Sequence, residues 1–251
     1  MKESVFRILR HYGVFAFFIF TYLFVGFALI VFKCPGYVAT ITANICGLTL
    51  GIFGYRYLSK LDSQKSEEKL KDMKREKIGY IIVFCLFTIF ANMSLSTYVV
   101  LRFANDVSNA RSESVNDTPM VILLLLSCIL APITEEIMMR LFSYNLLKRC
   151  SNWIVSMCVT SFVFGALHGT YEHLISGFLF GVVSVLLYEM TGTIFASIIY
   201  HMLYNFMVLG VTEDMLMIQS PNFEILMFIY IIVIISTVFL LNKRIKKIPE
   251  N

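Results

Sequence analysis

Charged side chains are scarce in this chain. Asp, Glu, Lys and Arg account for 15% of its 251 residues, whereas a soluble domain averages about 25%. Hydrophobic residues account for 58%, against about 45–50% in soluble domains. This balance excludes an ordinary soluble domain and indicates that lipid is the solvent for most of the chain. The formal net charge of +4 is too small to indicate nucleic-acid binding.

Paired cysteines are missing as well. None of the six cysteines belongs to a CxxC pair, the spacing that many zinc and redox sites use. Most lie in apolar runs, so we expect them to be small packing residues. They are Cys34, Cys46, Cys85, Cys128, Cys150 and Cys158. The first apolar run also lacks a small-residue cleavage pattern, so we expect a retained span rather than a cleaved signal.

The chain is rich in long apolar runs. A helix needs about 20 apolar residues to cross the hydrocarbon core of a bilayer, and eight runs approach or exceed this length. Helices keep their backbone polar groups satisfied in lipid, so we predict an all-α, polytopic integral membrane protein with about eight transmembrane helices. The runs are Val14–Phe32, Tyr37–Tyr57, Ile78–Leu101, Pro119–Leu147, Trp153–Leu167, Leu174–Met190, Ile194–Val211 and Phe223–Leu241.

Basic residues mark one side of the membrane. Lys and Arg precede the first run, follow the fourth and the eighth, and are densest in the segment 59–77 between the second and the third. With eight spans, all four basic segments fall on the same side. The positive-inside bias then predicts that both termini are cytoplasmic. We expect the segment 59–77 to be a solvated helix or a flexible loop.

The fourth run contains three ionisable residues, which are costly inside a membrane and therefore candidates for function. Glu136 and Arg140 are four residues apart with the acid first, the favourable order for an ion pair on a helix. This spacing predicts a structural role for both. Glu135 faces about 100° away from Glu136 on a helix and is left for chemistry. Pro132 interrupts the backbone hydrogen bonds beside it.

Two later runs contain polar residues at a similar depth. His168 ends the fifth run, and His201 and Asn205 share one face of the seventh. Hydrolysis of a peptide bond needs an activated water and donors for the oxyanion. Glu135 with His168 could activate the water, and His201 with Asn205 could donate to the oxyanion. Glu135, His168 and His201 also form a common catalytic zinc set, and this alternative stays open.

Three motifs in this order carry a family resemblance. Glu135-Glu136-x-x-x-Arg140, Phe164-x-x-x-His168 and His201-x-x-x-Asn205 resemble the motifs of the CPBP family of intramembrane proteases, also called the Abi family. The family includes CAAX proteases and bacteriocin-processing enzymes. The resemblance implies an endopeptidase in which Glu135 and His168 activate water and His201 and Asn205 form the oxyanion site. Both glutamate-type and metal-dependent mechanisms are associated with it, and we favour the former, without a cofactor, over zinc.

The resemblance also divides the chain and suggests its partners. Residues 1–118 would form a three-helix membrane region with a basic cytoplasmic loop, 119–211 the CPBP-like catalytic core, and 212–251 a last transmembrane helix with a basic tail. The expected partners are the lipid bilayer and a membrane-associated peptide or protein, with no nucleic acid. CAAX-type, pheromone and bacteriocin-type substrates all remain open. Short Lys-rich loops suit a bacterial plasma membrane, and the sequence does not indicate an oligomeric state.

Two other interpretations fit some of the same residues. Charges near the membrane midplane also mark transporters, but the chain shows no internal repeat of the kind common in them. A non-catalytic membrane regulator or immunity scaffold would keep the motifs without hydrolysis.

The residues around the end of the fifth run have structural interpretations. Gly165 and Gly169 would allow close helix approach. We expect Glu172 and His173, in the short turn after the fifth run, to be solvated rather than catalytic.

Overall fold

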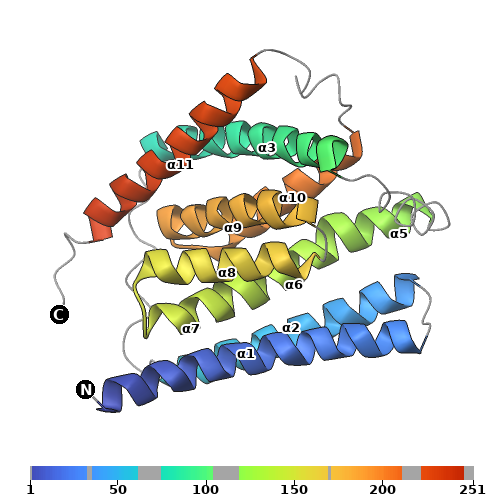
Figure 1. Ribbon diagram of the computed structural model, residues 1–251, viewed down its shortest axis with the longest axis vertical. Coiled ribbons are helices and arrows are strands. Elements are labelled where there is room, and N and C mark those ends of the chain that lie inside the picture. Colours follow the sequence, from blue (N-terminus) through green and yellow to red (C-terminus); the bar gives the residue numbers. More distant parts are fainter. Residues whose placement is uncertain are drawn as a thin grey trace. The chain divides into compact units, whose positions relative to one another are not determined.

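The computed structural model describes residues 2–32, 36–61, 75–103, 119–168, 171–210 and 222–245, and within these residues all regular structure is helical (Figure 1). The prediction of an all-α, polytopic membrane protein is confirmed. The helices are α1 (Lys2–Val31), α2 (Gly36–Leu61), α3 (Arg75–Phe103), α5 (Met120–Leu124), η1 (Leu125–Leu130), α6 (Ala131–Glu136), η2 (Ile137–Tyr144), α7 (Asn145–Lys148), α8 (Trp153–Leu167), α9 (Tyr171–Thr191), α10 (Ile194–Gly210) and α11 (Phe223–Ile245).

Within the described residues, each of the eight predicted apolar runs is helical over nearly all of its length. Six helical segments are long and apolar enough to cross a membrane, among them the continuous stretch Met120–Lys148. The apolar helices α8 and α10 are shorter, with 15 and 17 residues. The number of crossings and the cytoplasmic placement of both termini therefore stay predictions. Most of the basic segment 59–77 lies outside the described residues.

Large apolar side chains cover the outer surface of α1. Phe17, Phe20, Phe24 and Phe27 are each at least 60% exposed, and they recur at helical spacing. In water such a stripe would be unfavourable, but in lipid it faces a solvent as apolar as itself. The exposed phenylalanines therefore agree with a membrane-embedded helix. The five cysteines among the described residues are free thiols, and of these five Cys128 alone is buried; their role as packing residues stays a prediction.

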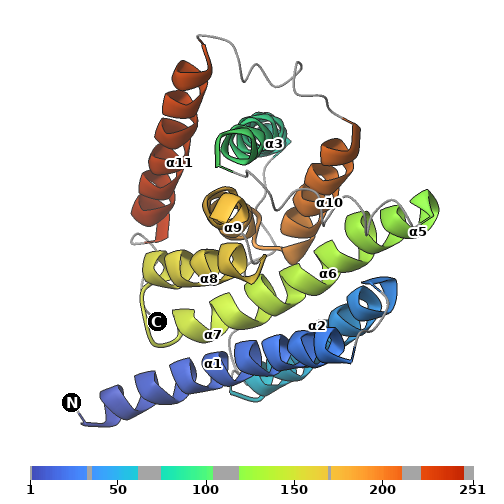
Figure 2. The same cartoon turned by 45° about the vertical axis from the view of Figure 1, so that its right-hand side comes forward.

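The chain divides into two compact units, and the division falls within α8. The first unit contains residues 1–66 and 106–160, and the second contains 67–105 and 161–251. In the first, α2 packs against α1, α6 and η2; α1 and α2 run side by side (Figures 1 and 2). In the second, α9 contacts α3, α10 and α11. Each motif residue is therefore placed within one of the two units.

Glycines on α2 allow it to approach the fourth helical segment closely. A Cβ atom at Gly51 would lie 2.7 Å from Ile137 Cγ2 and 3.3 Å from the backbone nitrogen of Met138. A Cβ atom at Gly47 would lie 2.8 Å from Thr134 Cγ2. The contacts of 2.7 and 2.8 Å are shorter than real Cβ atoms show, so a side chain at Gly51 or Gly47 would force its neighbour to move. α2 thus holds the segment that contains Glu135 and Glu136 at nearly backbone distance.

A second close approach joins α8 to α9. A Cβ atom at Gly165 would lie 2.5 Å from the carbonyl oxygen of Leu174 and 3.0 Å from the nitrogen of Phe178. From the other side, a Cβ atom at Gly177 would lie 2.9 Å from Gly165 Cα. The close approach predicted at Gly165 is confirmed, whereas Gly169 lies outside the described residues. This crossing brings the end of α8, with His168, against α9.

The fourth helical segment departs from regular α-helix on both sides of Pro132. π-Helical turns form η1 before α6 and η2 after it. Proline lacks the N–H that would bond one turn back, and the sequence predicted an interruption here. Wider turns also leave carbonyls for side chains: Ser143 Oγ donates to the Met138 carbonyl oxygen at 2.7 Å. Single π turns often occur at functional sites, and these flank both motif glutamates.

Candidate active site

The first unit contains the Glu-Glu-x-x-x-Arg motif. Arg140 Nε lies 3.1 Å from Glu136 Oε2, and the two side chains are 1% and 0% exposed. The ion pair expected from the spacing is therefore present. Two charges this deeply buried are tolerable only as a pair, because either one alone would remain uncompensated in an apolar environment. The geometry agrees with a structural role for Glu136 and Arg140, which stays a prediction.

Glu135 has different surroundings from its neighbour. Its side chain is half-buried, and the phenol of Tyr22 on α1 interacts with it electrostatically. A Cβ atom at Gly47 would lie 3.3 Å from Tyr22 Cε2, and the same Cβ atom would lie 2.8 Å from Thr134 Cγ2. α1 and α2 therefore build part of the environment of Glu135. The proximity of Tyr22 to Glu135 could not be predicted from the sequence, because a tyrosine in an apolar run gives no signal of its own.

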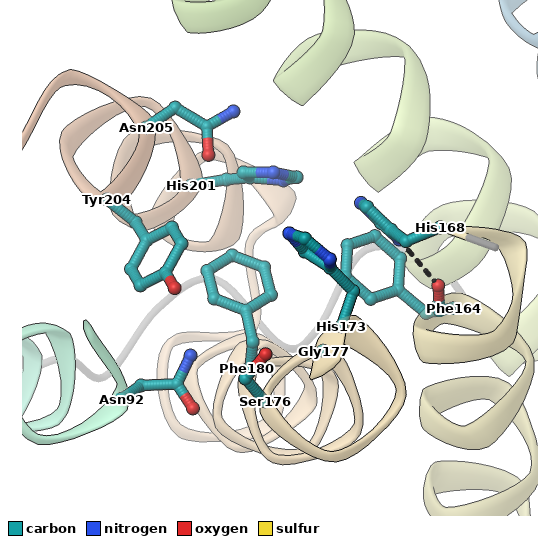
Figure 3. A pocket seen from close by; sticks show the side chains of 10 residues that line it. All are labelled: Asn92, Phe164, His168, His173, Ser176, Gly177, Phe180, His201, Tyr204 and Asn205. Atoms are coloured by element: carbon teal, nitrogen blue, oxygen red, sulfur yellow. Dashed lines mark hydrogen bonds between the residues drawn. The ribbon is translucent and has the colours of Figure 1, made fainter. Parts of the chain in front are cut away.

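The second unit contains a small pocket of about 50 Å³. His168 enters it from the end of α8, His201 and Asn205 from α10, and further residues from α9 and α3 (Figure 3). Three of the four predicted catalytic residues are thus brought together, and the fourth, Glu135, belongs to the first unit. The lining consists of Asn92, Phe164, His168, His173, Ser176, Gly177, Phe180, His201, Tyr204 and Asn205.

His168 is held by its own helix. Its Nδ1 lies 2.9 Å from the carbonyl oxygen of Phe164, one turn earlier, and the Phe164 ring packs 4.9 Å from the imidazole. A carbonyl oxygen only accepts hydrogen bonds, so the proton of the neutral ring resides on Nδ1. Nε2 then carries the lone pair. This tautomer makes His168 an acceptor toward the pocket, as a residue that orients or deprotonates water must be.

His201 is packed among aromatic rings. Its side chain is 4% exposed, and its ring lies edge-on to Phe180 and Phe164, with centroids 4.6 and 5.9 Å away. Such packing limits rotation of the imidazole. Asn205, one turn further along α10, lines the same pocket. α10 therefore presents an imidazole and an amide side by side, which is the pair expected for oxyanion donors.

The expectation that His173 lies in the turn before α9 is wrong, whereas the expectation that it is solvated rather than catalytic stays a prediction. His173 belongs to α9 and lines the pocket, and its ring is nearly parallel to that of His168, with centroids 6.0 Å apart and an interplanar angle of 11°. The close crossing of α8 and α9 at Gly165 brings it there. Sequence analysis placed it in an outer turn because its distance from the pocket cannot be judged from spacing alone. The side chain of Glu172 lies outside the described residues.

The zinc alternative finds no assembled ligand set within the part of the chain that is described. No group of three His, Cys, Asp or Glu side chains there is arranged to hold a metal ion. Nδ1 of His168 is engaged with a carbonyl, which leaves Nε2 as the atom on that ring that could bind a metal, the usual arrangement of a metal-binding histidine. The choice between the glutamate-type and the zinc mechanism stays a prediction.

The motif helices also match a known family. Residues 117–207 match the family model described as type II CAAX prenyl endopeptidase Rce1-like, and this range includes every motif residue from Glu135 to Asn205. Both the match and the motifs thus support a CPBP-like protease domain over this range. The CPBP domain, as the matched range is called here, begins just before α5 and ends in α10, so it contributes to both compact units. α1, α2, α3 and α11 lie outside it.

A relative supports the same assignment. "Putative membrane peptidase YdiL" of Bacillus subtilis (strain 168) is 24% identical to this chain over 147 residues, which are 55% of this chain and 59% of that protein. The chain thus covers less than two thirds of that relative's length. No solved structure matches the chain.

Proposed function

We propose that this chain is an intramembrane endopeptidase of a bacterial plasma membrane, which hydrolyses a peptide bond of a membrane-associated peptide or protein. The observation that carries the proposal is the pocket lined by His168, His201 and Asn205. Nδ1 of His168 bonds to the Phe164 carbonyl oxygen, so Nε2 carries the lone pair. A CAAX-type C-terminus is the first substrate class to test, because the family model is named for it. Pheromone and bacteriocin-type precursors follow.

The proposed reaction begins with a water molecule. Nε2 of His168 accepts one hydrogen bond from the water, and the carboxylate of Glu135 takes the other proton as the oxygen attacks the scissile carbonyl carbon. The new C–O bond converts the carbonyl into a tetrahedral oxyanion. When the C–N bond breaks, the proton on Glu135 passes to the leaving amine. Glu135 thus returns to the carboxylate, and one water is consumed per bond.

His201 and Asn205 take the oxyanion role in this proposal. A neutral imidazole has one N–H and an amide nitrogen has two, so both side chains have a hydrogen to donate toward the pocket. Rigid donors are most effective because they need no rearrangement as the charge develops. The aromatic packing of His201 supplies that rigidity. Removal of one oxyanion donor typically lowers kcat by about 100- to 1,000-fold.

The pocket suits a reaction that needs water within an apolar helix bundle. About 50 Å³ is enough for roughly three water molecules, at about 10–15 Å³ each on this measure. Polar side chains from four helices, α3, α8, α9 and α10, give such waters the partners they need. Water held in this way would be available to the scissile bond while bulk solvent stays outside.

The proposal is tested with purified protein in lipid nanodiscs and a panel of fluorogenic peptides: farnesylated CAAX-type, pheromone-type and bacteriocin-leader sequences. Wild type is compared with Glu135→Gln, and with Glu189→Gln as a control for the same chemical change on α9 outside the pocket lining. We expect cleavage by wild type and Glu189→Gln, and at least 1,000-fold slower cleavage by Glu135→Gln. Cleavage that Glu135→Gln retains would contradict the proposed role of Glu135.

Two further comparisons separate the alternatives. Addition of a chelator should leave the rate unchanged if the mechanism is of the glutamate type. Loss of activity that zinc restores would instead assign Glu135, His168 and His201 to a metal site. If no peptide in the panel is cleaved while the biological effect of the protein survives Glu135→Ala, the scaffold interpretation replaces the enzyme.

A further inference from the structure

One pocket-lining side chain comes from outside the CPBP domain. Asn92 lies on α3, is 0% exposed, and lines the pocket together with His168, His201 and Asn205. Its amide nitrogen Nδ2 has no partner at good hydrogen-bond geometry among the described residues, although the Tyr204 hydroxyl lies nearby. Buried amide groups nearly always have a partner, so a donor left open at a pocket wall indicates that the pocket contents accept from it.

Tyr230 fixes which end of the Asn92 amide faces the pocket. Tyr230 lies on α11, and its side chain is fully buried. Its hydroxyl donates a hydrogen bond to Asn92 Oδ1 at 3.3 Å. With the oxygen held by α11, the nitrogen is turned away from it, and Figure 3 shows it directed toward the Tyr204 and Phe180 side of the pocket. The orientation of the donor is therefore built by two helices that the family motifs do not include.

Tyr204 uses at most part of this donor. Its hydroxyl lies next to Asn92 and Ser96 of α3. An amide nitrogen carries two hydrogens, and the Tyr204 oxygen can accept only one of them. At least one N–H of Asn92 is thus left for a molecule in the pocket.

The lining indicates the chemistry of that molecule. Asn92 is uncharged, its neighbours in the pocket include Phe180 and Tyr204, and the described lining contains neither Lys nor Arg. Such surroundings accommodate a neutral acceptor, which needs no cation beside it. The backbone carbonyl oxygen of a peptide is the neutral acceptor that the proposed substrate supplies.

We propose that Asn92 donates a hydrogen bond to a backbone carbonyl oxygen of the bound peptide, as a substrate-binding residue contributed by α3. This inference rests on the proposed function. The bond forms in the ground state as well as in the transition state, so it contributes to KM more than to kcat. Asn92 thereby differs from His201 and Asn205, whose donors act on the oxyanion.

The first test is the kinetics of Asn92→Leu, which removes the donor and keeps a similar volume. With the farnesylated CAAX-type peptide, we expect KM to rise about tenfold, the value of one net hydrogen bond, while kcat changes by less than threefold. Ser96→Ala serves as the matched control, since Ser96 also neighbours Tyr204 but does not line the pocket. An equal rise of KM in Ser96→Ala would show that Asn92 acts by positioning Tyr204, and would overturn the proposal.

The second test locates the acceptor. Peptides with a single thioamide in place of one carbonyl are bound to the Glu135→Gln variant and to Glu135→Gln/Asn92→Leu, and affinity is measured by fluorescence anisotropy. One position should weaken binding to the first protein and leave binding to the second unchanged, the pattern of a double-mutant cycle. Equal effects at every position in both proteins would overturn the proposal, because the amide would then contact only water.

The two proposals can fail separately. Cleavage of the peptide with a KM that does not depend on Asn92 overturns this inference alone. Binding that depends on Asn92 without any cleavage by wild type overturns the proposed function and supports the donor. Absence of both binding and cleavage overturns both for this class of peptide.

Discussion

Replacement of Arg140 by methionine should be strongly destabilising, although methionine is apolar and suits a buried site. The substitution removes one partner of the Glu136–Arg140 pair, whose side chains are 0% and 1% exposed and whose atoms are 3.1 Å apart. Glu136 would be left without its cation in the first unit, beneath the close contact between α2 and η2. The carboxylate would then have to stay charged without compensation or take up a proton.

The magnitude follows from measured cases of this kind. Removal of one partner of a buried ion pair costs about 3–5 kcal/mol, whereas replacement of both partners by apolar residues is often neutral. Folded proteins are stable by only about 5–15 kcal/mol. We therefore expect Arg140→Met to lose about a fifth or more of the stability, and Glu136→Leu/Arg140→Met to recover at least about 2 kcal/mol of that loss.

The assay is reversible unfolding by SDS in mixed micelles, followed by circular dichroism. It compares wild type, Arg140→Met, Glu136→Leu and the double variant in one thermodynamic cycle, which isolates the coupling of the pair. A loss below about 1 kcal/mol in Arg140→Met would refute the structural role of the pair. A double variant no more stable than Arg140→Met would refute it as well, because the cost would then not come from the stranded carboxylate.

Two further outcomes are expected. His201→Gln should lower kcat for a cleaved peptide by about 100-fold or more with KM nearly unchanged, since it disturbs an oxyanion donor; an equal loss through KM would argue for a binding role. Gly165→Ala should reduce both stability and activity, because its Cβ atom would lie 2.5 Å from a backbone carbonyl of α9, whereas Gly13→Ala, with nothing within 4 Å, should behave as wild type; equal behaviour of the two variants would contradict the close crossing.

The helical segments could be predicted because lipid leaves few alternatives. Each apolar run had to satisfy its backbone hydrogen bonds internally, so run length predicted helix location without any knowledge of packing. The Glu136–Arg140 pair was predictable for a similar reason, since its two members lie on one helix at a spacing that brings them together. The π-helical form of η1 and η2 was not predictable, because the sequence shows where proline interrupts the ladder but not how the flanking turns adjust.

Residues that reach the pocket from other helices could not be predicted. In a lipid-exposed bundle, apolar side chains face both the lipid and the interior, so α3 shows no polar and apolar face that would indicate which side of it is buried. Asn92 therefore resembled any lone amide in a span, although it meets Tyr230 across 138 positions of sequence. The position of His173 beside His168 could not be predicted for a related reason. It results from the close crossing of α8 and α9 and not from the place of His173 in the sequence.

The central claim is that peptide hydrolysis depends on Glu135. Its most direct test is cleavage of the farnesylated CAAX-type peptide in H₂¹⁸O, with the product's new C-terminal carboxyl group analysed by mass spectrometry for wild type and for Glu135→Gln. We predict that wild type releases a product carrying ¹⁸O and that Glu135→Gln releases none above the uncatalysed background. Labelled product formed at the same rate by Glu135→Gln would contradict the account.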